Sequence, residues 1–87
     1  MPPMQAIQRP DRDATLNTAV EALRPSFDDI VQLANVSVEA AAGPEMPEAF
    51  VALAQRAESV GWTFGIAEDA IRQLAHEYLG ARAAFSD

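Results

Sequence analysis

Residues 47–79, PEAFVALAQRAESVGWTFGIAEDAIRQLAHEYL, decide the fold class because they hold two amphipathic segments on either side of a glycine-aromatic connector. In both segments apolar residues recur at the three- and four-residue spacing of one helix face. The first face comprises Phe50, Leu53, Ala54, Ala57 and Val60, and the second comprises Ala67, Ala70, Ile71, Leu74 and Tyr78. The stretch therefore predicts two helices joined by a short connector.

Proline and glycine give the expected boundaries of these two helices. Pro47 suits the first position of a helix over 47–60, and Gly61 is typical of a residue that ends one. The second helix is expected over 66–79, with Gly80 ending it. A connector of a few residues favours antiparallel packing of the two helices.

The N-terminal half adds two more predicted helices. Apolar spacing turns helical at Asp13, and Pro25 is expected to stop this helix because the residue before proline disfavours the α conformation. Ser26 is then expected to cap a helix that ends at Gly43-Pro44. No segment alternates apolar and polar residues with the period of two that is typical of a strand. The fold class is predicted to be all-α, a compact bundle of about four short antiparallel helices.

Domain organisation and location follow from composition. Residues 1–12 are expected to form a disordered N-terminal arm, 13–80 the helical domain and 81–87 a frayed tail. The chain lacks cysteine, an apolar signal segment and any apolar run long enough to span a membrane. We expect a cytoplasmic protein.

The net charge of −7 is concentrated in the middle of the chain. Residues 26–69 contain eight acidic side chains against one basic side chain, Arg56. Direct binding to nucleic acid or to an anionic membrane is not expected, because both need clustered positive charge. The acidic middle either complements a partner protein with a basic surface or simply keeps a small protein in solution.

The chemistry-bearing residues are few. The chain has no cysteine, no lysine and one histidine, His76. The adjacent acids Asp28-Asp29 and Glu68-Asp69 are expected to lie in the first turns of their helices and to stabilise them. We do not expect these carboxylates to act as a catalytic acid and base. We therefore expect no enzyme activity, no catalytic residue, no metal and no cofactor.

The connector is the most distinctive segment. Trp62 and Phe64 stand between glycines, either as a recognition patch or as a plug of the core where two helices meet. If Trp62 is exposed while Phe64 is buried, the recognition hypothesis is favoured. The candidate partner-binding residues are Trp62, Phe64, Asp28, Asp29, Glu45 and Glu48.

The segment Pro47–Ala54, followed by Gly61-Trp62-Thr63-Phe64 and then Glu68-Asp69, resembles the nitrogen-fixation-cluster leader-peptide family. The resemblance covers Pro47–Leu79, and it implies a short helical protein that docks on a maturation enzyme. The chain departs from the family pattern in the longer gap at Ser59-Val60, in the extra Gly65, and in Gly80-Ala81 where a double glycine is typical. These departures favour a relative that docks on a partner over a true precursor.

Three function classes remain open. The first is a protein–protein interaction module: an adaptor, a docking domain or a leader-like recognition domain. The second is an acidic inhibitor or antitoxin-like protein that offers carboxylates in place of phosphates. The third is a non-catalytic accessory subunit of a larger enzyme. All three are compatible with a homodimer, because the apolar face of a short helix pairs readily with its own copy.

Overall fold

The computed structural model describes the backbone of residues 7–10, 14–33, 38–43 and 45–85, with side chains in these ranges as far as Ala81. These ranges hold four helices and no strand, which confirms the all-α prediction. The helices are α1 (Leu16–Leu33), α2 (Val38–Ala42), α3 (Glu48–Ser59) and α4 (Phe64–Phe85). None of them is both long enough and apolar enough to cross a lipid bilayer, as far as the described residues go.

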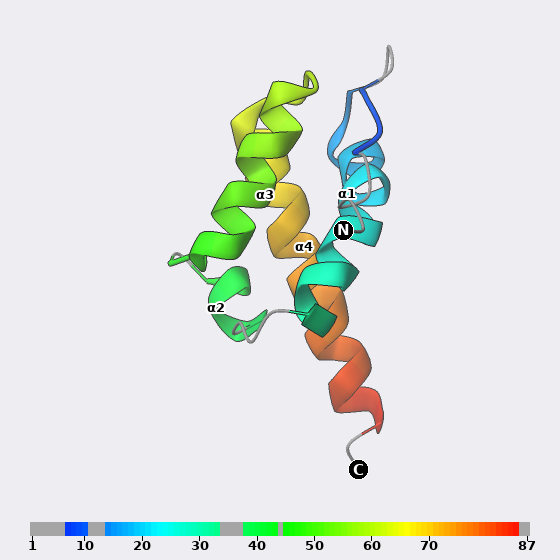
Figure 1. The fold of residues 1–87 in the computed structure, drawn as a ribbon. Helices are drawn as coiled ribbons and strands as arrows, with labels where there is room; N and C mark the ends of the chain where they lie inside the picture. Colours follow the sequence, from blue (N-terminus) through cyan, green and yellow to red (C-terminus); the bar gives the residue numbers. More distant parts are fainter. Residues whose placement is uncertain (1–6, 11–13, 34–37, 44, 86–87) are drawn as a thin grey trace.

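The three longer helices lie side by side, and each reverses the direction of the one before it (Figure 1). Helices α1 and α4 consequently run the same way, with α3 antiparallel to both. Helix α4 packs against each of the other three, so it is the central element of the bundle. Its C-terminal turns extend beyond the ends of the other helices (Figure 1).

The core combines a few large side chains with many alanines. The rings of Phe27 and Phe50 stack with centroids 5.2 Å apart and join α1 to α3. Leu23, Leu53 and Ile71 are fully buried around them. Alanines in the core let the helix backbones approach closely, so the bundle packs despite its short supply of large apolar residues. The fully buried alanines are Ala19, Ala41, Ala54, Ala57, Ala67, Ala70 and Ala75.

Helix α1 continues through Pro25, so the prediction that this residue ends a helix is wrong. Pro25 lies on the exposed side of α1, where its ring displaces no core contact. Leu23, Phe27 and Ile30 lie on the buried side and form one continuous apolar stripe. Burying a large apolar side chain stabilises by about 1.5–3 kcal/mol, so two of them together equal or exceed a proline cost of about 3 kcal/mol.

Ser26 is therefore an interior residue of α1 and not the cap of a second helix. Its side chain is 1% exposed, and Ser26 Oγ has no hydrogen-bond partner within the described residues. The carboxylates of Asp28 and Asp29 likewise lie within α1, away from a helix start. Residues 34–37, which were expected to be helical, lie outside the described ranges.

The boundaries of α3 agree with prediction to within a residue. The helix begins at Glu48, and the Pro47 carbonyl accepts hydrogen bonds from the backbone N–H groups of Phe50 and Val51, both at 3.0 Å. At its end Gly61 adopts φ 120°, a conformation that side-chain-bearing residues rarely adopt. Gly43-Pro44 was expected to end the preceding helix. Gly43 does follow directly after α2, and Pro44 lies outside the described residues.

Helix α4 is longer than predicted at both ends. Thr63 caps its start, because Thr63 Oγ1 accepts a hydrogen bond from the Ile66 N–H at 3.2 Å. Gly80 does not end the helix, which runs to Phe85. Residues 81–85 are therefore helical rather than frayed, while 86–87 lie outside the described ranges. Glu68 and Asp69 were expected in the first turn of this helix, but they lie after it because α4 begins earlier than predicted.

Residues 7–10 also differ from the predicted disordered arm. They form no helix or strand, but Ile7 is 7% exposed and belongs to the hydrophobic core. Pro10 lies against Gly61, at the end of α3. The N-terminal segment is thus attached to the bundle at these positions, and the rest of the expected arm lies outside the described residues.

Candidate partner-binding surface

Trp62, the residue whose exposure was to decide between recognition and core packing, is buried at 3% exposure. Its backbone N–H donates to the Ala57 carbonyl at 3.1 Å, which holds the turn after α3. Its indole Nε1–H donates to the Gln8 carbonyl at 2.8 Å. A buried indole normally finds such a partner, and here the N-terminal segment supplies it. The core interpretation of Trp62 is therefore the one that the geometry favours.

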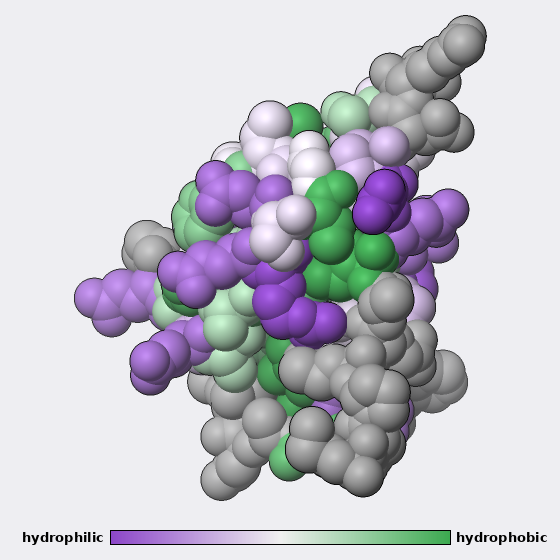
Figure 2. All heavy atoms as spheres, turned by 45° about the horizontal axis from the view of Figure 1, so that its top comes forward, coloured by the Kyte–Doolittle hydropathy of each residue, from purple (hydrophilic) through white to green (hydrophobic). Residues whose placement is uncertain are grey.

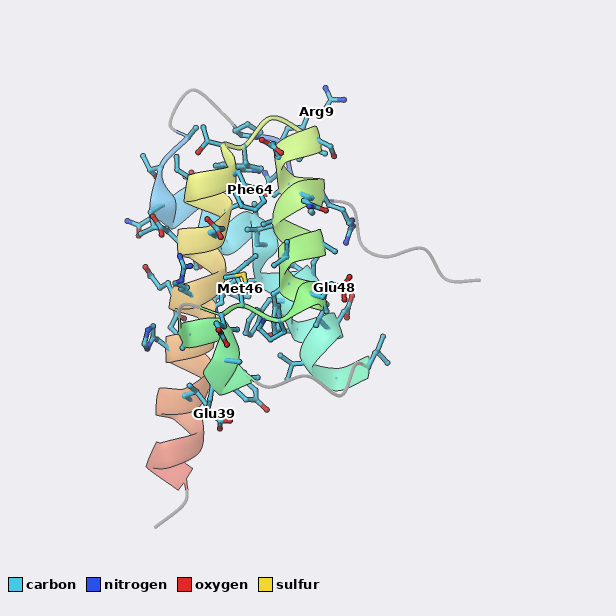
Figure 3. The ribbon with its side chains drawn as sticks, turned by 90° about the vertical axis from the view of Figure 1, so that its left-hand side faces the viewer. Arg9, Glu39, Met46, Glu48 and Phe64 are labelled. Carbon is cyan, nitrogen blue, oxygen red and sulfur yellow. The ribbon has the colours of Figure 1, made fainter. Side chains whose placement is uncertain are left out.

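Phe64 is partly buried and packs on the edge of the core. It lies at the same end of the bundle as Arg9, whereas Glu39 lies at the opposite end (Figure 3). On the face that Figure 2 turns toward the reader, hydrophilic side chains surround smaller apolar areas. The aromatic connector thus offers no broad exposed aromatic surface on the described residues.

The four predicted acidic residues lie on different elements. Asp28 is exposed and Asp29 half-buried on α1, while Glu45 and Glu48 are exposed before and at the start of α3. Asp28 lines a groove between α1 and α4, and Glu45 lines a separate hollow beside α2. The structure does not bring the four carboxylates into one site, nor does it place them around Trp62 and Phe64.

A groove between α1 and α4 includes Asp28, one of the predicted partner-binding residues. Its volume is about 240 Å³. The floor is apolar, and the rim contains charged side chains from both helices. The lining residues are Arg24, Phe27, Asp28, Leu74, Glu77, Tyr78 and Ala81.

An ion-pair network holds one side of this groove. Arg24 pairs with Glu21 at 2.8 Å on its own helix and with Glu77 at 3.2 Å on α4. The hydrogen bond from Arg24 and its charge lower the pKa of the Glu21 carboxyl, and the same hydrogen bond to Glu21 raises the pKa of Arg24. Asp28 lies outside the network and has no ion pair with any described residue. Among the described residues of the groove, Arg24 is paired with two carboxylates, whereas the Asp28 carboxylate has no ion pair.

The contribution of α4 to this groove was not predicted from the sequence. Tyr78 was assigned to the core face, yet it is only partly buried and lines the groove. Ala81 was assigned to the frayed tail, yet it is helical, exposed and on the same wall. The signal was present in the spacing of Leu74, Tyr78 and Ala81, which continues one helix face across Gly80.

The second pair of adjacent acids has a structural partner. Arg72 lies within 3.9 Å of Glu68 and 3.5 Å of Asp69, and its Nε–H donates to the Gly43 carbonyl at 3.4 Å. The hydrogen bond to Gly43 joins α4 to the end of α2. His76 is exposed. The described part of the chain contains no group of three or more side chains placed to hold a metal ion.

No family model, curated protein or solved structure matches this chain. The resemblance of Pro47–Leu79 to the leader-peptide family consequently stays a prediction that rests on its short motif.

Proposed function

We propose that this protein is a protein–protein interaction module that binds a partner in the groove between α1 and α4. The observation that supports this proposal best is the combination of an apolar floor with an acidic residue that has no ion pair with any described residue. Phe27 and Leu74 close the bottom of the groove, and Tyr78 and Ala81 form its open side. The C-terminal turns of α4 extend past the other helices (Figure 1).

The lining indicates which partner segment fits. An amphipathic helix or short strand would place an apolar side chain on the ring of Tyr78 and a basic side chain opposite Asp28. Helix-in-groove recognition of this kind uses a few apolar anchors, with charge complementarity setting orientation and partner choice. The existing Arg24–Glu77 pair closes one side of the groove, so the basic residue is expected toward Asp28.

The proposal is tested with two matched arginine variants of the tagged full-length chain. Ala81→Arg puts a long cationic side chain into the groove, where it fills space and neutralises the local acidity. Ala52→Arg makes the same change on the exposed outer face of α3. Partners are captured from the native lysate at low and moderate salt, and circular dichroism checks that both variants keep their helices.

Loss of one partner with Ala81→Arg, with that partner retained by Ala52→Arg, would support the groove as the binding surface. Retention of the partner by Ala81→Arg, its loss with both variants, or the absence of any partner would contradict the proposal. A third variant replaces Asp28, Asp29, Glu45 and Glu48 by their amides. It tests whether partner binding depends on these negative charges or on the shape of the groove. A partner lost with this variant and kept by Ala81→Arg would favour the acidic-inhibitor hypothesis instead.

A further inference from the structure

Residues Ile7–Pro10 contact the bundle in a way that differs from the helix packing around them. The segment has no regular secondary structure, and it reaches the turn between α3 and α4 from 54 residues away in the sequence. Gln8 and Pro10 contact Trp62 and Gly61 in this turn. The segment is therefore held to the turn by a carbonyl contact and a proline ring contact.

Three contacts fix the segment. The Ile7 side chain is buried in the core at 7% exposure. The Gln8 carbonyl accepts the hydrogen bond from Trp62 Nε1 at 2.8 Å. Pro10 lies so close to Gly61 that a Cβ on this glycine would come within 3.1 Å of the proline ring. Each contact recognises a different feature: an apolar side chain, a backbone carbonyl and a proline.

The chemistry of this site resembles general proline-peptide recognition. Aromatic-lined surfaces bind proline-containing segments because proline pre-orders the peptide in an extended conformation at little entropic cost. Pro10 also restricts Arg9 to an extended backbone. The indole N–H donates to a peptide carbonyl and so fixes the orientation of the bound segment. Because Gly61 has no side chain, the proline ring has room beside it.

The segment is not sealed on all sides. A hollow of about 350 Å³ lies beside it, lined by Gln8 and Arg9, by the first turns of α1 and by Trp62. A segment without regular secondary structure and with few contacts opens at a lower free-energy cost than the helices of a core. Opening here exposes Trp62, the only tryptophan of the chain.

We infer that Gly61 and Trp62 form a receptor for a short non-helical peptide with an apolar residue followed three positions later by proline. Ile7–Pro10 is the tethered occupant of this receptor, and a partner peptide of the same chemistry replaces it. This site lies apart from the groove between α1 and α4 and does not depend on its function. A tethered segment competes at an effective concentration in the millimolar range, so the closed chain binds an external peptide weakly.

The probe for this inference is a dye-labelled synthetic peptide with the sequence of residues 5–12, QAIQRPDR. Its fluorescence anisotropy is titrated with the full chain as wild type, as Ile7→Asp and as Leu33→Asp. Ile7→Asp removes the tethered apolar anchor, and Leu33→Asp makes the same change at an 86% exposed position. Circular dichroism confirms that each variant is helical.

We expect Ile7→Asp to bind the probe at least about tenfold more tightly than wild type and Leu33→Asp, because the binding-competent fraction rises. A probe with aspartate in place of its isoleucine and alanine in place of its proline should not bind. Adding Trp62→Phe to Ile7→Asp should weaken binding by about 2- to 12-fold, the value of one hydrogen bond.

The inference is overturned if the probe binds no helical variant, or if it binds wild type and Ile7→Asp equally. It is also overturned if the altered probe binds as well as the original, because the contacts would then be nonspecific. Should Ile7→Asp lose its helical signal, Ile7→Ala replaces it, with an expected gain of about threefold over wild type. Equal binding of the probe by Ile7→Ala and wild type then overturns the inference in the same way.

Discussion

Replacing Pro25 by alanine should make the bundle more stable, and the size of the effect follows from its position in α1. Pro25 has no backbone N–H, so the Glu21 carbonyl one turn earlier receives no hydrogen bond from this position. The Pro25 side chain is exposed, so the substitution removes no core contact. Every change in free energy therefore comes from the backbone of α1.

The expected gain lies between two limits. A proline inside an ideal helix costs about 3 kcal/mol relative to alanine. If the helix has bent enough to relieve the ring clash, only the missing hydrogen bond remains, at about 1 kcal/mol. The midpoint of about 2 kcal/mol corresponds to a rise in the melting temperature of about 8–16 °C for a domain of this size.

The assay is thermal and urea unfolding followed by circular dichroism at 222 nm. Gln32→Ala, an exposed substitution in the same helix, serves as the control and should change stability by less than about 0.5 kcal/mol. An unchanged or lower stability of Pro25→Ala would refute the reasoning. It would mean that the proline sets a helix shape that the stack of Phe27 on Phe50 requires.

Three further predictions concern single side chains. Ser26→Ala should stabilise the chain by about 1 kcal/mol in urea unfolding, because it removes a buried hydroxyl with no partner in the described structure; a loss of stability would reveal a hydrogen bond. Gly61→Ala should cost about 1–3 kcal/mol because of φ 120°, while Gly80→Ala, with open space around it, should gain about 0.5 kcal/mol; equal effects would contradict the two backbone assignments. The pKa of Glu21 should lie below 4.5 in a carboxyl NMR titration and rise in Arg24→Gln. Since this folded-state pKa is lowered, the stabilisation is present above pH 4.5 and lost as the pH falls below it, and an unmoved titration would rule out the pair.

Helical spacing predicted the fold class because it is a local property. The apolar stripes of α3 and α4 were visible in residues 47–79, and the predicted boundaries of α3 lie within a residue of those observed. The errors arose where local signals compete with packing. At Pro25 the burial of Phe27 and Ile30 outweighs the proline, and at Gly80 the following alanines keep α4 helical at a cost of about 1 kcal/mol.

The candidate surface was harder to predict because it depends on contacts between distant parts of the chain. Asp28 was identified as a partner-binding candidate, but its neighbours across the groove come from α4. The burial of Trp62 depends on Gln8, 54 residues earlier, and no pattern within the connector contains that information. Ala81 was discarded because Gly80 was expected to end the helix, so one error in a boundary removed a groove residue.

Site-specific photo-crosslinking in the native cell shows whether the groove between α1 and α4 binds a partner protein. A photo-reactive amino acid is placed at Ala81, which lines the groove, and separately at Ala52, on the outer face of α3. We predict that position 81 crosslinks one protein, through a segment with a basic residue next to an apolar one, and that position 52 does not crosslink it. The same set of proteins crosslinked from both positions, or none from position 81, would contradict the account.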